Sequence, residues 1–203
     1  MNANLRSIGR TIWAAIRIML VFTVVLGVAY PLLITGIGQA AFAWQANGSP
    51  IRNAGGQIVG SALIGQSFVD ASGNPLPQYF QPRPSAAGDG YDGAASAGSN
   101  KGPEDADLIA AVAARRAQIA AFNGVSEADV PADAVTASGS GLDPDISVAY
   151  ADIQIQRVAT ARGIPADQVR ALVEANTDGP GLGYIGEPCV HVVQLNLALD
   201  ERR

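Results

Sequence analysis

The longest apolar stretch of the chain lies near its N-terminus and carries no charge. Charged residues are absent between Arg17 and Arg52, and within this window residues 18–38 form a run of 21 almost wholly apolar positions. A helix of that length extends about 30 Å, the thickness of the hydrocarbon core of a bilayer. Trp13 and Trp44 flank the run, as interfacial tryptophans do. The pattern predicts a transmembrane helix over residues 18–38.

Small and helix-breaking residues lie within this span. Pro31 is compatible with a transmembrane helix where neighbouring helices satisfy the freed carbonyl. Thr23 and Gly27 are four positions apart and form a small-xxx-small pair that allows a partner helix to approach closely. The alternative is a cleaved signal peptide, for which residues 41–43 supply an A-x-A site. The apolar run is long for a signal peptide, so the sequence favours an uncleaved anchor.

The basic residues set the expected orientation. Three arginines precede the span, whereas Arg52 is the only basic residue in the 40 positions after it. The positive-inside rule then places residues 1–17 in the cytoplasm and residues 39–203 on the outer side of the membrane. This outer part has ten basic and eighteen acidic residues, and its formal charge is therefore −8. We expect a single-pass protein of the bacterial inner membrane.

Hydrophobic periodicity beyond the anchor predicts one loop-rich α+β domain. Apolar residues repeat at helical spacing in three segments, and two further segments have the β-prone runs or alternation of strands. The expected elements are a strand at 57–64, a helix from Pro103 to Gly124, a helix from Asp143 (its N-cap) to Gly163, a helix at 166–176 and a strand at 190–197.

Residues 73–103 are dense in Gly, Pro, Ser and Asn and permit two interpretations. Such composition is typical of flexible linkers. However, Tyr79, Phe80 and Tyr91 are interspersed in it, and aromatic anchors favour an ordered loop that packs on the domain. Both interpretations remain open from the sequence alone.

Composition excludes several classes of function. Acidic residues outnumber basic ones by 18 to 13 and the isoelectric point is about 4.7, which argues against nucleic acid as a partner. With one cysteine, Cys189, and one histidine, His191, the chain has no internal disulfide and no zinc site built from several Cys or His ligands. We expect Cys189 to be a buried filler and His191 a buried residue on the apolar face of a strand, and we assign no metal ligand.

Three sequence features resemble catalytic or binding motifs. Residues 181–186 match G-x-G-x-x-G by letter, but a helix precedes them and a strand follows, which indicates a turn rather than a dinucleotide site. Residues 136–141 form either a tight loop or a backbone nest for an anion. Three acidic residues lie near that loop: Asp133, Asp143 and Asp145. They are either helix-capping residues or a cluster of carboxylates that performs acid–base catalysis or binds a cation. No catalytic residue is assigned.

Several longer motifs occur in a fixed order along nearly the whole chain, and together they resemble the C subunit of the bacterial Kdp-type potassium-transporting ATPase. The segments that carry the resemblance are residues 44–49 (WQANGS), 60–68 (GSALIGQSF), 79–80 (YF), 83–85 (RPS), 98–100 (GSN), 135–144 (VTASGSGLDP), 157–159 (RVA) and 195–200 (LNLALD).

The resemblance implies an accessory, non-catalytic subunit of a hetero-oligomeric complex for potassium transport. Its expected partners are a channel-like potassium-binding subunit, a P-type ATPase subunit, a small single-span subunit and the lipid bilayer. In this family the C subunit is described as an assembly and catalytic chaperone that raises the affinity of the ATPase subunit for ATP. ATP, Mg²⁺ and K⁺ therefore belong to the complex, and no cofactor is assigned to this chain.

The resemblance also implies a nucleotide contact by a glutamine, which corresponds here to Gln154. That contact conflicts with the expected topology, because ATP is cytoplasmic and Gln154 is predicted to lie outside. An outer domain can still change ATP affinity through conformational coupling, in which case Gln154 contacts protein. The rival mechanism is that the acidic domain lies near the potassium entrance and stabilises the channel-like subunit.

The densest family motif supplies the expected contact with partner subunits, through Thr136, Ser138, Ser140 and Asp143. Two alternatives to an accessory subunit remain. One is a free-standing, membrane-anchored periplasmic binding module, and the other is an anchored hydrolase that uses Ser138 or Ser140.

Overall fold

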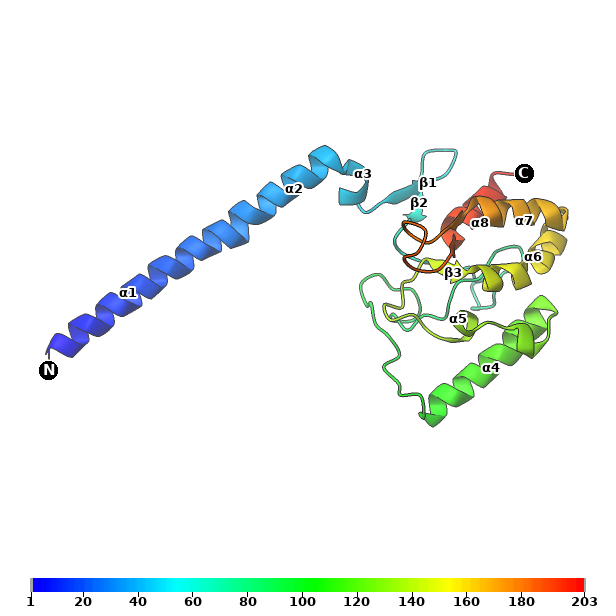
Figure 1. Ribbon diagram of the computed structural model, residues 1–203, viewed down its shortest axis with the longest axis horizontal. Helices are drawn as coiled ribbons and strands as arrows, with labels where there is room; N and C mark the ends of the chain where they lie inside the picture. Colours follow the sequence, from blue (N-terminus) through cyan, green and yellow to red (C-terminus); the bar gives the residue numbers. More distant parts are fainter. Residues whose placement is uncertain (1, 203) are drawn as a thin grey trace. The chain divides into compact units, whose positions relative to one another are not determined.

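The computed structural model describes residues 2–202, and the chain divides after Ser49 into two units. The first unit contains α1 (Asn2–Val24), a π-helical turn η1 (Val25–Ala29), α2 (Tyr30–Ala41) and the short α3 (Ala43–Ala46). Within it, the stretch Ser7–Ala41 is 35 residues long, apolar and unburied, and it is long enough to cross a membrane (Figure 1). The helix thus extends beyond both ends of the predicted span.

The π-helical turn ends at Ala29, two residues before Pro31. Pro31 has no N–H, and its ring crowds the carbonyl of the residue four positions earlier, Gly27. The backbone widens here, so that the Tyr30 N–H donates to the Val25 carbonyl, a π-type bond between residues five positions apart. The proline is therefore accommodated without a break in the helix.

The second unit, from Pro50 onward, is the predicted α+β domain. It contains a two-stranded antiparallel sheet, β1–β2, and a three-stranded antiparallel sheet in the order β3–β5–β4. Its elements are β1 (Pro50–Arg52), β2 (Ile58–Ser61), α4 (Ala106–Asn123), η2 (Glu127–Asp129), α5 (Ala132–Val135), β3 (Asp145–Ser147), α6 (Val148–Arg162), α7 (Ala166–Ala175), β4 (Thr177–Asp178), β5 (Cys189–His191) and α8 (Val192–Asp200).

One hydrophobic core joins these elements. Helix α6 packs against α4 and α7, and α7 packs against α8 (Figure 1). The buried side chains come from all of these helices and from the inner face of the three-stranded sheet, and they include Val158, Val169, Val190 and Leu195. Burial of a Val or Leu side chain stabilises the fold by about 1.5–3 kcal/mol, so the core holds the sheet in place.

The glycine-rich stretch 73–103 is a packed loop, as one of the two interpretations proposed. Phe80 and Ala87 are fully buried within it, and Phe80 belongs to the main core. The Tyr91 hydroxyl donates to the Arg83 carbonyl at 2.8 Å, which closes the loop on itself. The aromatic residues are therefore anchors.

Two sequence predictions are wrong. The strand expected at 190–197 ends at His191, and α8 begins at Val192, because its buried residues Val192, Val193, Leu195, Asn196 and Leu199 also follow helical spacing. The helix expected from Asp143 begins at Val148. Ser147 is its N-cap, with its hydroxyl accepting from the Tyr150 N–H at 3.0 Å, because residues 145–147 pair with β5.

The other predicted boundaries are close to the observed ones. Helix α4 starts after the N-cap Asp105 rather than at Pro103, and both α4 and α6 end at left-handed glycines, Gly124 and Gly163. Helix α7 buries Val169, Leu172 and Val173, as expected.

Candidate functional site

Residues 136–144, which belong to the densest family motif (135–144), connect separate parts of the domain, and we call them the junction loop. The backbone carbonyls of three successive residues at its centre accept hydrogen bonds from segments far away in the sequence. The pairs are Ala97 N to Ser140 O at 3.0 Å, Ser85 Oγ to Gly141 O at 2.6 Å and Gly65 N to Leu142 O at 2.9 Å. The loop thereby fixes the path of the irregular segment between β2 and α4.

A glycine at the centre of the junction loop makes this packing possible. Gly141 has a φ of 67°, and a Cβ added there would lie 2.6 Å from the Ala97 carbonyl oxygen and 2.7 Å from the Ala87 nitrogen. At Gly139, two residues earlier, an added Cβ meets no described atom within 4 Å. Gly141 is thus required by close backbone approach as well as by its left-handed conformation.

The candidate side chains of this loop are engaged within the domain. The Thr136 hydroxyl donates to the Ala132 carbonyl at 2.8 Å. Ser138 is buried with its Oγ 3.5 Å from that of Ser140, and Ser140 Oγ accepts from the Leu142 N–H at 3.1 Å. Asp143 forms an ion pair with Arg83 at 2.9 Å. These contacts give the motif a structural role, and its contact with a partner stays a prediction.

The three clustered acids have separate partners. Both oxygens of Asp133 accept from Ser147, at 2.8 Å from its N–H and 2.8 Å from its hydroxyl. Asp143 binds Arg83, while Asp145 lies beside His191 on the sheet. Each of the three carboxylates is therefore bonded to a different partner residue within the domain.

Gln154 and Asn196 form a pair of clamps on the loop 77–81. Gln154 Oε1 accepts from the Gln81 N–H at 2.7 Å and its Nε2 donates to the Gln81 carbonyl at 3.1 Å. Asn196 makes the same two bonds with Phe80, at 2.8 and 2.9 Å. Side-chain amides thereby satisfy the buried backbone groups of two successive residues, as a neighbouring strand would.

An arginine completes the Gln154 clamp. Arg157 donates to Gln154 Oε1 at 2.7 Å and to the Tyr79 carbonyl at 2.9 Å, and its guanidinium lies 4.4 Å from the centre of the Phe122 ring. Burial lowers the pKa of Arg157 to about 10. Because Gln154 is 0% exposed, a nucleotide would reach its amide only if this clamp opened.

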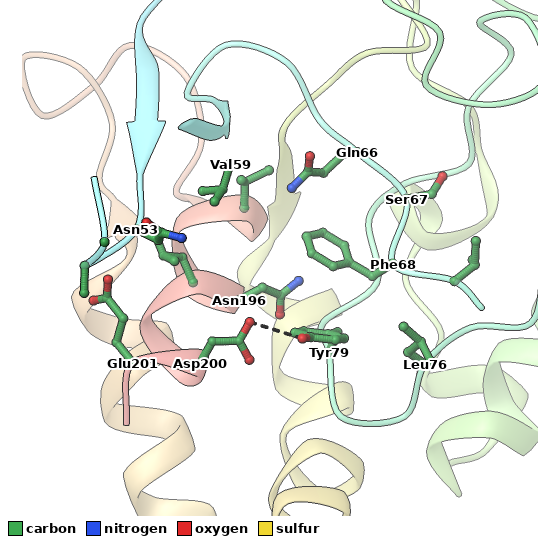
Figure 2. A pocket seen from close by; sticks show the side chains of 15 residues that line it. Asn53, Val59, Gln66, Ser67, Phe68, Leu76, Tyr79, Asn196, Asp200 and Glu201 are labelled. Carbon is green, nitrogen blue, oxygen red and sulfur yellow. Dashed lines mark hydrogen bonds between the residues drawn. The ribbon is translucent and has the colours of Figure 1, made fainter. Parts of the chain in front are cut away.

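A cavity of about 580 Å³ lies between the 66–79 segment, the two-stranded sheet and α8. Figure 2 shows the rings of Phe68 and Tyr79 on one side of it and Asp200 and Glu201 of the C-terminal end on another. The Tyr79 hydroxyl donates to Asp200 at 3.1 Å, and Arg162 pairs with the same carboxylate at 2.8 Å. Its volume falls in the range of small-molecule sites.

The three-stranded sheet brings together four polar side chains, those of Asp145, Asp178, Cys189 and His191. Asp145 of β3 lies opposite His191 of β5, and Asp178 of β4 lies opposite Cys189. His191 Nδ1 is 2.6 Å from Asp145 and its Nε2 is 3.0 Å from Asp178. The expected site for His191 on an apolar strand face is therefore wrong, and only strand pairing brings the four together.

Burial and charge act together on the titration of this cluster. Burial lowers the pKa of His191, but the hydrogen bonds to Asp145 and Asp178 outweigh it, so that the pKa lies above its ordinary value. Burial, with the negative charge of Asp145, raises the pKa of the half-buried Cys189 thiol. The two carboxylates thus favour the protonated, positively charged form of His191, which lies between them.

Residues 180–186 form a self-contained turn between β4 and β5, and we call it the apolar turn. Gly181 and Ile185 exchange two backbone hydrogen bonds, each 2.8 Å long. The turn holds Leu182, Tyr184 and Ile185 in solvent, with 83%, 77% and 56% of their surfaces exposed. Residues 181–186, which match G-x-G-x-x-G, thus form a turn, as predicted. The exposure of the apolar residues of this turn was not predicted.

The candidate packing residues of the anchor lie on the first unit. The Thr23 hydroxyl donates to the Met19 carbonyl at 2.8 Å, which leaves its methyl group 3.9 Å from a Cβ added at Gly27. Thr23 and Gly27 therefore share one helix face, and Pro31 follows one turn later. Packing of this face against another helix stays a prediction.

Comparison with known proteins places the chain in a family. The model of the family described as "K+-transporting ATPase, c chain" matches residues 12–201. The chain belongs to the KdpC family. A Potassium-transporting ATPase KdpC subunit of Caulobacter vibrioides is 57% identical over 182 residues, which cover 89% of this chain and 88% of the relative. Those of Mycobacterium tuberculosis and Beijerinckia indica are 52% and 53% identical, and cover 94% and 91% of this chain and 98% and 90% of the relatives.

KdpC membership confirms the resemblance inferred from the ordered motifs. The family match includes both the apolar helix and the α+β domain, because it runs from residue 12 to residue 201. The KdpC relatives are named as a subunit of a potassium-transporting ATPase, not as its catalytic chain.

Proposed function

We propose that this chain is an accessory, non-catalytic subunit that assembles and stabilises a membrane-embedded potassium-transporting ATPase complex. Its partners in this proposal are a channel-like potassium-binding subunit and a P-type ATPase subunit, with a small single-span subunit alongside. Membership of the KdpC family supports the proposal, together with an apolar helix long enough for a membrane anchor.

The observation that carries an assembly role is the apolar turn. Three large apolar side chains stand in solvent on a turn whose backbone bonds stay within the turn. Exposed aromatic and aliphatic residues in such a cluster are typical of protein–protein contacts, where a few of them supply most of the binding energy. We assign the turn as a contact with another subunit of the same complex.

Purification of the complex tests this function. We would purify a C-terminally tagged chain in mild detergent from potassium-starved cells and identify the co-purifying proteins by mass spectrometry. A P-type ATPase and a channel-like protein in near-equal amounts would support the accessory role. Recovery of the tagged chain alone, in a preparation that preserves other membrane complexes, would contradict it.

We further propose that the N-terminus is cytoplasmic and the domain lies outside. The arginines before the span support this orientation. Because Cys189 is the only cysteine, a Cys189→Ser chain with Glu104→Cys in the exposed start of the α4 region carries a single label site. A membrane-impermeant maleimide should label intact spheroplasts; labelling only after permeabilisation would reverse the orientation.

An effect on ATP affinity is then transmitted through protein contacts, with ATP, Mg²⁺ and K⁺ bound by the other subunits. The burial of Gln154 supports indirect coupling, because its amide is already bonded to Gln81 and Arg157. Photo-crosslinking of a nucleotide analogue to the purified complex should label the ATPase subunit. Efficient labelling of this chain at α6 would show direct nucleotide contact and contradict the proposal.

The 580 Å³ cavity favours a second candidate, a membrane-anchored periplasmic binding module. Val59→Trp, at the cavity wall, discriminates the two because it fills the space without removing a hydrogen bond. The accessory role predicts that this variant assembles and supports potassium uptake like the unaltered chain. Intact assembly with loss of uptake would favour a ligand in the cavity.

A further inference from the structure

We propose that Asp145, Cys189 and His191 form a binding site for a zinc-class divalent ion on the outer face of the β3–β5–β4 sheet. One ligand atom from each of the three residues lies within 4.8 Å of the other two. Carboxylate oxygen, thiolate sulfur and imidazole nitrogen are together the donor set of Zn²⁺ and related ions. The proposal concerns this chain alone and does not depend on its role in assembly.

Strand pairing creates the cluster. Cys189 and His191 are two positions apart on β5, so their side chains emerge on the same face of the sheet. Val190, between them, points to the opposite face and is fully buried in the core. Asp145 faces His191 directly across the β3–β5 pair, and directly opposed residues share a face. Backbone hydrogen bonds thus hold the donors together before any ion binds.

Asp178 supplies a supporting contact from the third strand. It lies opposite Cys189, and its carboxylate is 3.0 Å from His191 Nε2. With a metal ion on Nδ1, the Nε2–H donates to this carboxylate, an arrangement that orients metal-bound histidines in many proteins. Asp178 is therefore a positioning residue, and the ligand set is Asp145, Cys189 and His191 with water completing the coordination.

The present spacing requires only a small adjustment. Zn–S bonds of about 2.3 Å and Zn–N or Zn–O bonds of about 2.0–2.2 Å in a tetrahedron separate the ligand atoms by roughly 3.3–3.7 Å. The ion enters between His191 Nδ1 and Asp145, now 2.6 Å apart, and replaces their hydrogen bond. All three side chains are partly exposed, which leaves a path from solvent.

The donor set also determines which ions are excluded. Mg²⁺, Ca²⁺ and K⁺ prefer oxygen ligands, whereas this site presents one sulfur and one nitrogen. Binding would join β3 to β5, because Asp145 lies on β3 whereas Cys189 and His191 lie on β5. The contact of Asp178 with His191 Nε2 adds β4 at the base of the apolar turn. An ion there would tie the three strands together through side chains as well as through the backbone.

Cobalt titration of the full-length chain in detergent tests the site. The chain carries an affinity tag without histidine and is treated with EDTA first. Co²⁺ should bind one per chain and give a thiolate-to-cobalt charge-transfer band with the intense visible bands of a tetrahedral ion. Zn²⁺ should remove these bands, whereas excess Mg²⁺ or K⁺ should not. Absence of the charge-transfer band at saturating Co²⁺ would overturn the proposal.

Variants separate ligands from surface carboxylates. Cys189→Ser keeps the side-chain shape and should abolish the charge-transfer band, with the metal-free thermal midpoint unchanged. Asp178→Asn should keep the band but weaken Co²⁺ binding about 10–100-fold, the usual cost of losing such a support. Asp152→Asn, which removes an exposed carboxylate paired with Arg170, is the matched control and should change nothing. Retention of the band in Cys189→Ser would place the metal elsewhere and contradict the assignment.

Discussion

The junction loop and the apolar turn both have glycine-rich sequences, but the first is packed within the domain and the second is exposed to solvent. In the junction loop, Gly141 lets the segments at Ala87 and Ala97 approach its backbone, and a Cβ there would lie 2.6 Å from the Ala97 oxygen. In the apolar turn, Gly183 also has a positive φ, of 83°, but no described atom lies within 4 Å of the added Cβ. Gly141 thus permits close packing, whereas Gly183 permits only the left-handed conformation of the turn. A loop hydrogen-bonded to other segments stabilises the domain, whereas a turn whose hydrogen bonds are internal leaves its side chains available for contact with a partner.

The largest expected effect is at the packed glycine. Gly141→Ala should lower the free energy of unfolding by about 3 kcal/mol or more, because the new methyl group meets backbone atoms that cannot rotate away. Thermal unfolding of the full-length chain in detergent, followed by circular dichroism, measures this. Gly139→Ala is the matched control and should cost less than about 1 kcal/mol, since its methyl group meets open space. Equal losses of unfolding free energy in the two variants would show that close packing at Gly141 does not matter.

The second effect concerns the loop 77–81, which leads into the segment that the junction loop holds. Gln154→Ala should cost about 3 kcal/mol, because it leaves the N–H and carbonyl of Gln81 without their side-chain partner and removes one of the hydrogen bonds of the buried Arg157 guanidinium. Gln156→Ala, on the exposed face of the same helix, should change stability by less than about 0.5 kcal/mol in the same assay. If both variants unfold alike, the clamp has no structural role.

A smaller effect is expected in the apolar turn itself. Gly183→Ala forces an alanine into the left-handed region and should cost about 1 kcal/mol, well below the cost at Gly141. The measurement is again the thermal midpoint of the full-length chain. A loss as large as that of Gly141→Ala would mean that the turn is packed against the domain after all.

The sequence predicted much of this fold because local signals were strong. The apolar run, the C-cap glycines Gly124 and Gly163, and the stripe of α7 each depend on near neighbours in the chain. The segment 190–197 failed because its apolar positions fit both a strand and a helix, and tertiary packing decided between them. Asp143 failed as a helix cap because residues 145–147 pair with β5, more than 40 residues away, so that α6 begins only at Val148.

The candidate sites were harder to predict, since they depend on strand pairing and on exposure. Asp145, Asp178 and His191 are adjacent only through the register of three short strands, which no pattern in the sequence reveals. For Gln154 the resemblance implied a nucleotide contact and the topology a protein contact, and nothing in its local sequence indicates that it is buried against Gln81. The exposure of Leu182 and Tyr184 likewise follows from the hydrogen bonds of the turn.

The most direct test of the account is co-purification of the complex with a Leu182→Asn/Tyr184→Ser chain. Asparagine suits the positive φ of Leu182, and both side chains are exposed, so the thermal midpoint of the variant should match that of the unaltered chain. Ile109→Ser removes an exposed apolar side chain from α4 and serves as the control. We predict that the turn variant recovers at least about tenfold less of the other subunits, as expected for the loss of two interface anchors, while the control recovers them fully. Full recovery with the turn variant would contradict the assignment of the turn as the contact between subunits.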